Sequence, residues 1–245
     1  EKIRNSTVKN PSIDKDLTLF QENGSFSDID YDDTQMTNWT PIKHVERLSD
    51  FVYAYTNPKN QYYQNEDLYQ KIVKGLEYWY DVDSESDNWW HNQISEPQKL
   101  GLLLIQMRIG KKQIPQDLET KILKRIQETG GDPAKWTGAN RTDIALHCSC
   151  LTQNETDLKT AIDNVFNPIV YTTEEGFQHD NSYFQHGEQL YIGGYGDEII
   201  KGVTQVASYA LGTQYELSKE KVELLSKFMR ETIVPCADKT CRSMW

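Results

Sequence analysis

Apolar residues recur every three or four positions along most of this sequence, and this spacing constrains the fold more than any other feature. Residues three or four apart lie on one face of an α-helix. Gly and Pro fall between the apolar stripes, at Asn57-Pro58, Glu96-Pro97, Gly110, Gly130-Gly131, Asn167-Pro168 and Gly193-Gly194, where they end or start helices. The sequence therefore predicts an all-α fold. The stripes are Val45, Leu48, Val52, Tyr55; Leu68, Ile72, Leu76, Trp79; Leu100, Leu103, Leu104, Met107; Leu118, Ile122, Ile126; Ile199, Val203, Val206, Ala210; and Val222, Leu225, Phe228, Met229.

Short loops between these helices predict antiparallel helical hairpins, which assemble into either a bundle or a ring. Periodicity does not choose between the two. A chain of 245 residues can form one sizeable core or two small ones, and we expect a single helical domain over residues 1–245. Residues 1–40 are acidic and Ser-rich without clear periodicity, so we expect them to wrap the surface.

The formal net charge of -11 argues against a nucleic-acid partner, because proteins that bind nucleic acid usually carry a basic face. No stretch approaches the roughly 20 apolar residues that cross a bilayer, so we expect no membrane partner. The four cysteines, Cys148, Cys150, Cys236 and Cys241, form no CxxC pair and have no His at zinc-finger spacing. They are free thiols or one disulfide, and we expect no metal and no cofactor.

The first candidate functional segment is marked by two adjacent tryptophans, in Asn88-Trp89-Trp90-His91-Asn92. It lies ahead of a helix that we expect to start near Ser95. Neighbours on a helix face about 100° apart, so Trp89 and Trp90 cannot both enter one core. Either Trp89 packs under the loop and Trp90 covers it, or the pair forms a platform that stacks on a sugar ring.

The segment from Thr137 to Asp143 leads into another expected helix and contains Asn140 and Arg141. Asn140 is either an ordinary helix cap or an amide that donates a hydrogen bond to a ligand carboxylate. Arg141 is either a solvated surface cation or an added positive charge at such a site.

The most informative segment is Glu175–Gly187, followed by Tyr191–Gly196, in which His, Tyr, Asn and Gly crowd ahead of an apolar helix. Glycines on both sides of Tyr195 give the backbone freedom to turn that ring toward a cleft. The positive end of the following helix would favour a phenolate there. A single His or Tyr is more often structural, but this combination favours a functional site.

Three of these segments, NWWHNQISEPQKLG, TGANRTDIALH and EEGFQHDNSYFQHGEQLYIGGYG, follow one another about 50 residues apart. In this order they resemble parts of the helical domain of polysaccharide lyase family eight. Residues 15 to 234 resemble the helical domain of that family, and in detail they are most similar to its chondroitin AC lyases. The resemblance implies an incomplete α/α toroid of antiparallel helical hairpins, followed in the family by a β-sandwich region.

The resemblance also implies a reaction, β-elimination of chondroitin or hyaluronan at a uronic acid to give an unsaturated uronate. Asn140 and His186 match the pair around the uronate carboxylate, and Tyr195 matches the tyrosine that transfers the proton. Trp89 and Trp90 match the aromatic patch that holds the sugar chain, and Arg141 lies beside Asn140 as a substrate-binding candidate. Secretion or a periplasmic location in a bacterium is implied as well, and we expect a monomer.

After Val234 the sequence departs from the family. The relatives continue through an active-site arginine and a β region with a catalytic glutamate, whereas residues 235–245 show no match, and Arg242 does not fill the role of that arginine. We therefore expect a truncated lyase that is weak or inactive by itself.

Two alternative functions remain from the sequence. A non-catalytic glycosaminoglycan-binding domain would retain Trp89, Trp90 and Asn140 without turnover. A metal-free α/α-barrel glycoside hydrolase would need two suitably placed carboxylates, and none stands out.

Overall fold

The computed structural model describes residues 1–6, 9–134 and 139–236, apart from the side chains of residues 139–142. The chain divides into two compact units. The first unit comprises Glu1–Asp132 and His147–Asn154, and the second comprises Pro133–Leu146 and the residues from Glu155 onward. Helices dominate both units, as the apolar periodicity predicted.

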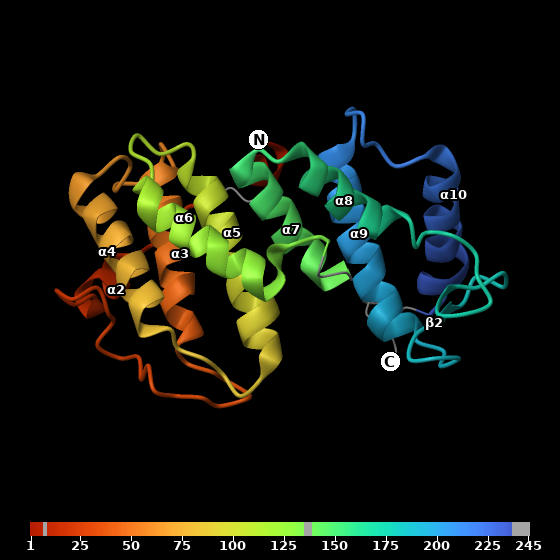
Figure 1. Ribbon diagram of the computed structural model, residues 1–245, viewed down its shortest axis with the longest axis horizontal. Coiled ribbons are helices and arrows are strands. Elements are labelled where there is room, and N and C mark those ends of the chain that lie inside the picture. The colour runs from red at the N-terminus through yellow and green to blue at the C-terminus, as the bar shows by residue number, and fades with distance from the viewer. Residues whose placement is uncertain (7–8, 135–138, 237–245) are drawn as a thin grey trace. The chain divides into compact units, whose positions relative to one another are not determined.

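The first unit is a set of packed helices, with α3 against α4 and α5, and α6 against the same two helices (Figure 1). Its elements are α1 (Lys2–Asn5), α2 (Asp14–Leu19), α3 (Ile42–Thr56), α4 (Glu66–Val82), the π-helical turn η1 (His91–Ser95), α5 (Glu96–Met107), α6 (Gln116–Ile126) and the π-helical turn η2 (Gln127–Gly131).

Helix α4 shows how local sequence sets these boundaries. The side chain of Asn65 caps its first turn by accepting a hydrogen bond from Leu68 N at 2.9 Å. Glu66 and Asp67 follow in the first turn, where carboxylates are stabilised by the helix dipole. The helix ends where Asp83 takes a left-handed conformation, with φ 48° and ψ 46°.

Close packing of α3 on α4 depends on a glycine. A Cβ atom at Gly75 would lie 2.6 Å from Leu48 Cδ2, so a larger residue would require the buried Leu48 side chain or one of the helices to shift. Leu48, Ile72 and Leu76 are fully buried at this contact, in agreement with the predicted stripes.

The N-terminal segment contributes side chains to this core. Ile13, Phe26 and Trp39 are each 1% exposed, although the segment contains only the short helices α1 and α2 among its described residues. The Phe26 ring lies edge-on to His44, with centroids 5.2 Å apart, and close to Phe51.

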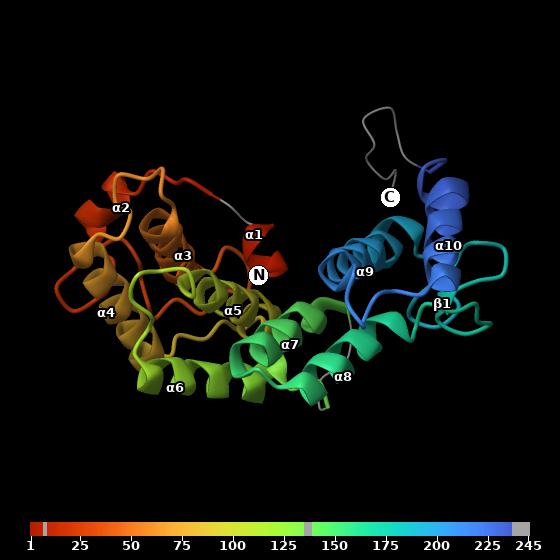
Figure 2. The ribbon, with the colours of Figure 1, turned by 90° about the horizontal axis from the view of Figure 1, so that it is seen from above.

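The second unit combines helices with a small hairpin (Figure 2). Its strands pair antiparallel, with Gly176 opposite Phe184 and Phe177 opposite Tyr183. The elements are α8 (Glu155–Phe166), β1 (Gly176–Phe177), β2 (Tyr183–Phe184), the π-helical turn η3 (Ile192–Gly196), α9 (Asp197–Ala210), α10 (Lys219–Phe228) and the π-helical turn η4 (Met229–Ile233), together with the first part of α7 (Ala139–Thr152).

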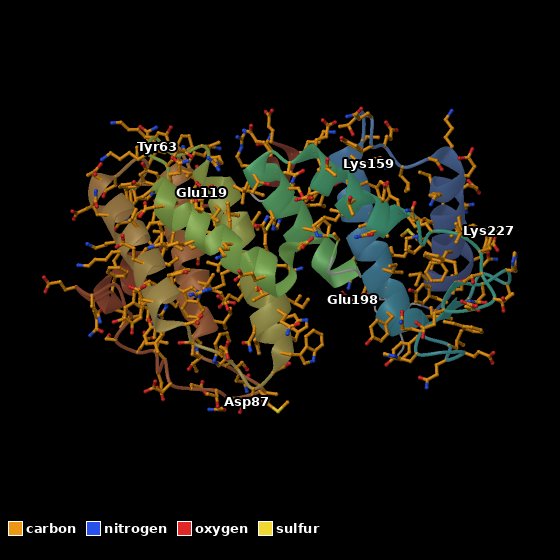
Figure 3. All side chains as sticks on the ribbon, viewed as in Figure 1. Tyr63, Asp87, Glu119, Lys159, Glu198 and Lys227 are labelled. Carbon is orange, nitrogen blue, oxygen red and sulfur yellow. The ribbon has the colours of Figure 1, made fainter. Side chains whose placement is uncertain are left out.

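A second hydrophobic core joins these elements through Val203 and Val206 of α9, Phe228 of α10 and Phe177 of the hairpin. Charged side chains such as Lys159 and Glu198 are exposed on the helices (Figure 3).

One predicted stripe is wrong in part. Val222 and Met229 are 50% and 38% exposed, and α10 instead buries Leu224, Leu225 and Phe228. Leu224 and Leu225 lie four and three positions before Phe228, so these three residues share the face that meets the core.

The described helices include none that is both long and apolar enough to cross a membrane. Among the described residues, Cys148, Cys150 and Cys236 form no disulfide bond, and Cys241 lies outside the described residues.

Candidate functional site

Two of the predicted catalytic side chains are in contact. His186 Nε2 lies 3.1 Å from Tyr195 Oη, and the two rings meet edge to face with centroids 5.1 Å apart. Both side chains reach solvent, and Tyr195 is 39% exposed. At this distance the phenol can donate a hydrogen bond to a neutral imidazole or accept one from its protonated form. The pair can therefore hold a proton on either ring.

His186 occupies a tight turn in an unusual backbone conformation. Its φ is 58°, and Gly187 follows with φ 81°. The turn is closed by a hydrogen bond from Gln185 N to Gln189 O at 3.0 Å. A left-handed conformation costs a non-glycine residue about 1–2 kcal/mol, so surrounding contacts must hold it.

Tyr195 lies in η3, directly before α9, as the sequence predicted. Gly196 N donates to Tyr191 O at 2.9 Å, and Tyr191 N donates to Tyr183 O at 2.8 Å. Tyr183 is buried in the second core. These bonds tie the backbone around Tyr195 to the hairpin that carries His186.

Tyr191 joins the pair, although sequence reasoning did not single it out. Its ring centroid lies 5.0 Å from that of Tyr195 and 6.3 Å from that of His186. A Cβ atom at Gly194 would lie 2.7 Å from Tyr191 Cδ1, so glycine is needed for this ring to occupy its place. The glycine pair beside Tyr195 was the available signal, because it marks a position where another group approaches the backbone.

Carboxylates are the main charged groups in the segments around His186 and Tyr195. Burial raises the pKa of Tyr183, and the nearby Glu175 carboxylate raises it further, which keeps this phenol neutral. Asp197 and Glu198 occupy the first turn of α9, where both pair with Lys201, at 2.6 and 3.5 Å.

Trp89 and Trp90 are exposed in the first unit, at 58% and 41%. The exposure of Trp89 argues against its packing beneath the loop. Helix α5 begins at Glu96, as the expected start near Ser95 predicted, but helical residues already begin at Trp89 and continue through η1 into α5, which the sequence did not predict. A π-helical turn breaks the 3.6-residue period, so the apolar pattern of α5 could not reveal the residues before it.

The tryptophan pair has its own support. His91 packs between Trp90 and the buried Trp39, with ring centroids 5.3 and 5.5 Å apart. The side chain of Asn88 accepts a hydrogen bond from Trp90 N at 3.0 Å. Trp90 is thus held at its backbone and by one ring contact, while 41% of the residue is exposed.

The remaining candidates cannot be placed as side chains. The backbone of Asn140 and Arg141 belongs to the first turn of α7, but their side chains lie outside the described residues. Nearby, burial raises the pKa of Asp143 to about 6. No group of three or more His, Cys, Asp or Glu in the described part of the chain could hold a metal ion.

Comparisons with known proteins point to one family. The model of the N-terminal alpha-helical domain of polysaccharide lyase family 8 matches residues 2–240. Chondroitinase-AC of Pedobacter heparinus is 43% identical over 223 residues, which cover 89% of this chain and 32% of the relative. Hyaluronate lyase HylB of Enterococcus faecalis is 28% identical over 197 residues, which cover 70% of this chain and 20% of the relative.

Solved structures agree. A chondroitinase AC lyase determined with oligosaccharides matches 96% of this chain and 36% of its own at a TM-score of 0.88 and 40% identity. A Paenibacillus xanthan lyase matches 80% of this chain and 19% of its own at a TM-score of 0.68 and 20% identity, which shows the shared fold alone. The predicted fold class is confirmed. The chain spans about a fifth to a third of the length of the curated relatives described above.

Proposed function

The chain belongs to polysaccharide lyase family 8, and from this premise we propose that it is the helical domain of a lyase that cleaves chondroitin or hyaluronan at a uronic acid. The single observation that carries the proposal is the contact between His186 Nε2 and Tyr195 Oη at 3.1 Å. The relatives named for chondroitin and hyaluronate support an acidic glycosaminoglycan as substrate.

The proposed reaction is β-elimination. Tyr195, as a phenolate, takes the proton from the carbon next to the uronate carboxylate. The electron pair of that bond forms a double bond to the neighbouring carbon, whose bond to the glycosidic oxygen breaks. Tyr195 then gives its proton to the departing oxygen, so the phenolate is restored and an unsaturated uronate remains.

Two further side chains lower the barrier in this proposal. Charge builds on the carboxylate as its neighbouring carbon loses a proton, and preorganised donors stabilise that charge. His186 and Asn140 are proposed as these donors. His186 also touches the phenol oxygen, and a positive imidazole there would favour the phenolate that has to act as base.

Binding requires attraction at short range, because a net charge of -11 repels a polyanion at a distance. We propose that Trp89 and Trp90 stack on sugar rings, which needs no charge. Arg141 is proposed as a cation beside Asn140. Affinity should fall as salt is raised, since the ionic part of the binding is screened.

The experiment measures binding and turnover separately. Calorimetry with chondroitin and hyaluronan tetrasaccharides should show binding by the 245-residue chain, and ultraviolet absorbance follows the unsaturated uronate with the chain in excess. We propose weak or no turnover for the chain by itself, because it spans 32% of its chondroitinase-AC relative. Any product must disappear in Tyr195→Phe.

Tyr63→Phe is the matched control, since Tyr63 is also 39% exposed but lies on the loop after α3. Absence of binding to both tetrasaccharides would contradict the proposal, as would product that persists unchanged in Tyr195→Phe. Binding without any product is expected both for a lyase domain that is inactive by itself and for the alternative, a non-catalytic glycosaminoglycan-binding domain, which the exposure of Trp89 and Trp90 also supports. Product that is lost in Tyr195→Phe identifies the lyase.

We also propose that the protein is secreted or periplasmic and acts as a monomer. The named relatives from Pedobacter and Enterococcus are bacterial, which supports the bacterial setting. Light scattering on the purified chain and fractionation of expressing cells test these two proposals.

A further inference from the structure

The turn that carries His186 is held from outside by a single carboxylate. Glu175 Oε1 accepts a hydrogen bond from Gly187 N at 2.5 Å, and Glu175 Oε2 accepts one from the side chain of Gln185 at 2.8 Å. The two donors belong to the residues immediately before and after His186. One carboxylate therefore spans the residue whose ring meets Tyr195.

Strand register explains why Glu175 reaches this turn. Gly176 lies opposite Phe184 in the antiparallel hairpin. Extending that register by one residue brings Glu175 opposite Gln185, at the start of the turn. Nearby, Phe184 and Leu190 form an antiparallel bridge that closes the base of the same turn.

The two hydrogen bonds to the Glu175 carboxylate form a clamp on residues 185–187, where the backbone conformation most needs support. His186 and Gly187 have φ values of 58° and 81°, and only the second residue adopts such a value easily. The Gly187 N–H is fixed by a charged acceptor, which makes a stronger hydrogen bond than a neutral one. Because the backbone of His186 sets the direction of its side chain, this bond also sets where the imidazole lies.

Gln185 connects the clamp to the second core. Its side-chain oxygen lies 3.4 Å from the hydroxyl of Tyr183, whose ring packs against Phe177 and Phe228. The Glu175 carboxylate thus links the exposed turn to buried aromatic rings.

We infer that Glu175 is a positioning residue for the lyase reaction: its carboxylate holds the turn at residues 185–187 in the conformation that brings His186 onto Tyr195. It does not touch the reacting atoms, and it acts through His186. The meaning of this placement for catalysis rests on the proposed function, whereas the placement itself can be tested without substrate.

The first test is structural. Nuclear magnetic resonance of the full chain reports the His186 backbone angle through its coupling constant and the ring contact through the nuclear Overhauser effect between His186 and Tyr195. Glu175→Leu removes both acceptors and should lose the positive φ signature and the ring contact. Glu175→Gln keeps an acceptor for Gly187 N–H and should retain both.

Glu174→Leu is the matched control, since Glu174 is an exposed neighbour of the same charge, and it should preserve both signals. If Glu175→Leu fails to fold, Glu175→Asp serves instead. It keeps the charge but is one methylene shorter, so it cannot reach Gly187 N–H and should lose the ring contact. Retention of the His186–Tyr195 contact in a folded Glu175→Leu or Glu175→Asp variant overturns the inference.

The second test uses chondroitin tetrasaccharide in calorimetry. Glu175→Leu should bind roughly tenfold more weakly than the wild type. In this variant the displaced His186 imidazole would no longer donate its charge-assisted hydrogen bond to the carboxylate of the uronic acid. Glu174→Leu removes the same negative charge and should bind at least as tightly as the wild type, because that charge repels a polyanion. An equal loss of affinity in both variants would show that the effect does not come from the contacts of Glu175 and would overturn the inference. If the wild type itself binds neither chondroitin nor hyaluronan, the proposed function fails while the resonance test of the clamp stands.

Discussion

Protonation of His44 should destabilise the first unit in acid. His44 Nε2 lies 2.9 Å from Gly75 O, which can only accept, so this nitrogen carries the hydrogen. Nδ1 then accepts from the hydroxyl of Tyr31 at 2.8 Å. That hydroxyl oxygen already accepts from Phe26 N at 2.9 Å, so a proton on Nδ1 would leave the Tyr31 hydroxyl hydrogen without its acceptor.

The size of the effect follows from the pKa. Burial, opposed in part by the bond to Gly75 O, lowers the pKa of His44 from 6.5 to about 4. Because the folded pKa is the lower one, the unfolded chain binds the proton more readily, and stability is lost as pH falls from 6.5 toward 4. The full loss amounts to about 3 kcal/mol.

His44→Gln isolates this contribution from other titrating groups. Glutamine can donate to Gly75 O and accept from Tyr31 but does not titrate. Urea unfolding, followed by circular dichroism at a series of pH values, gives the free energy of unfolding for both proteins. The variant should be less stable at pH 7 because it loses the ring stack on Trp79, and its deficit should shrink by about 3 kcal/mol toward pH 4.

His179→Gln is the control exchange, because His179 is exposed and stacks on Tyr171. A deficit of His44→Gln that stays constant between pH 7 and pH 4 would refute the reasoning, since the buried ring would then contribute nothing to the pH dependence.

Four further changes have defined expectations. Leu48→Ala should lower the free energy of unfolding by about 2–5 kcal/mol, because the Leu48 side chain is fully buried. Asn65→Ala should lower it by about 1 kcal/mol, because the cap of α4 is lost. Urea unfolding measures both. Gly194→Ala should displace the Tyr191 ring and weaken binding of chondroitin tetrasaccharide; unchanged affinity and unchanged ring contacts in resonance spectra would contradict this. Trp90→Ala should weaken the same binding roughly tenfold in calorimetry through loss of stacking, and wild-type affinity would remove Trp90 from the site.

Helix faces were the most predictable part of the fold. Leu68, Ile72, Leu76 and Trp79 follow the helical period and are all buried on α4, because the period and the burial have the same geometric cause. The prediction failed at the last helix, where Val222 is 50% exposed. Apolar character alone did not identify the face that meets the core.

The π-helical turns could not be predicted from periodicity. Trp89 and Trp90 are helical and lie directly before the turn at His91–Ser95, where the sequence suggested a loop. Each such turn shifts the following residues relative to the 3.6-residue repeat, so the pattern on one side says little about the other.

The His186–Tyr195 contact joins two residues that the family resemblance assigned to the active site, although the pair that the resemblance named was Asn140 and His186. Glu175 and Tyr191 were missed as site components because their contacts depend on strand register and on the fold of a glycine-rich turn. Neither leaves a periodic signal. The roles of Asn140, Arg141, Trp89, Trp90, His186 and Tyr195 stay predictions that binding and turnover must test.

The most direct test of the account is a resonance titration of the 245-residue chain with chondroitin tetrasaccharide, following the ring signals of His186, Tyr195, Trp89 and Trp90. The account predicts that the signals of His186 and Tyr195 in the second unit shift and saturate with ligand, and that the signals of the two indoles in the first unit do so as well. Saturation of binding with His186 and Tyr195 unmoved, or no shift in any of the four rings, would contradict it.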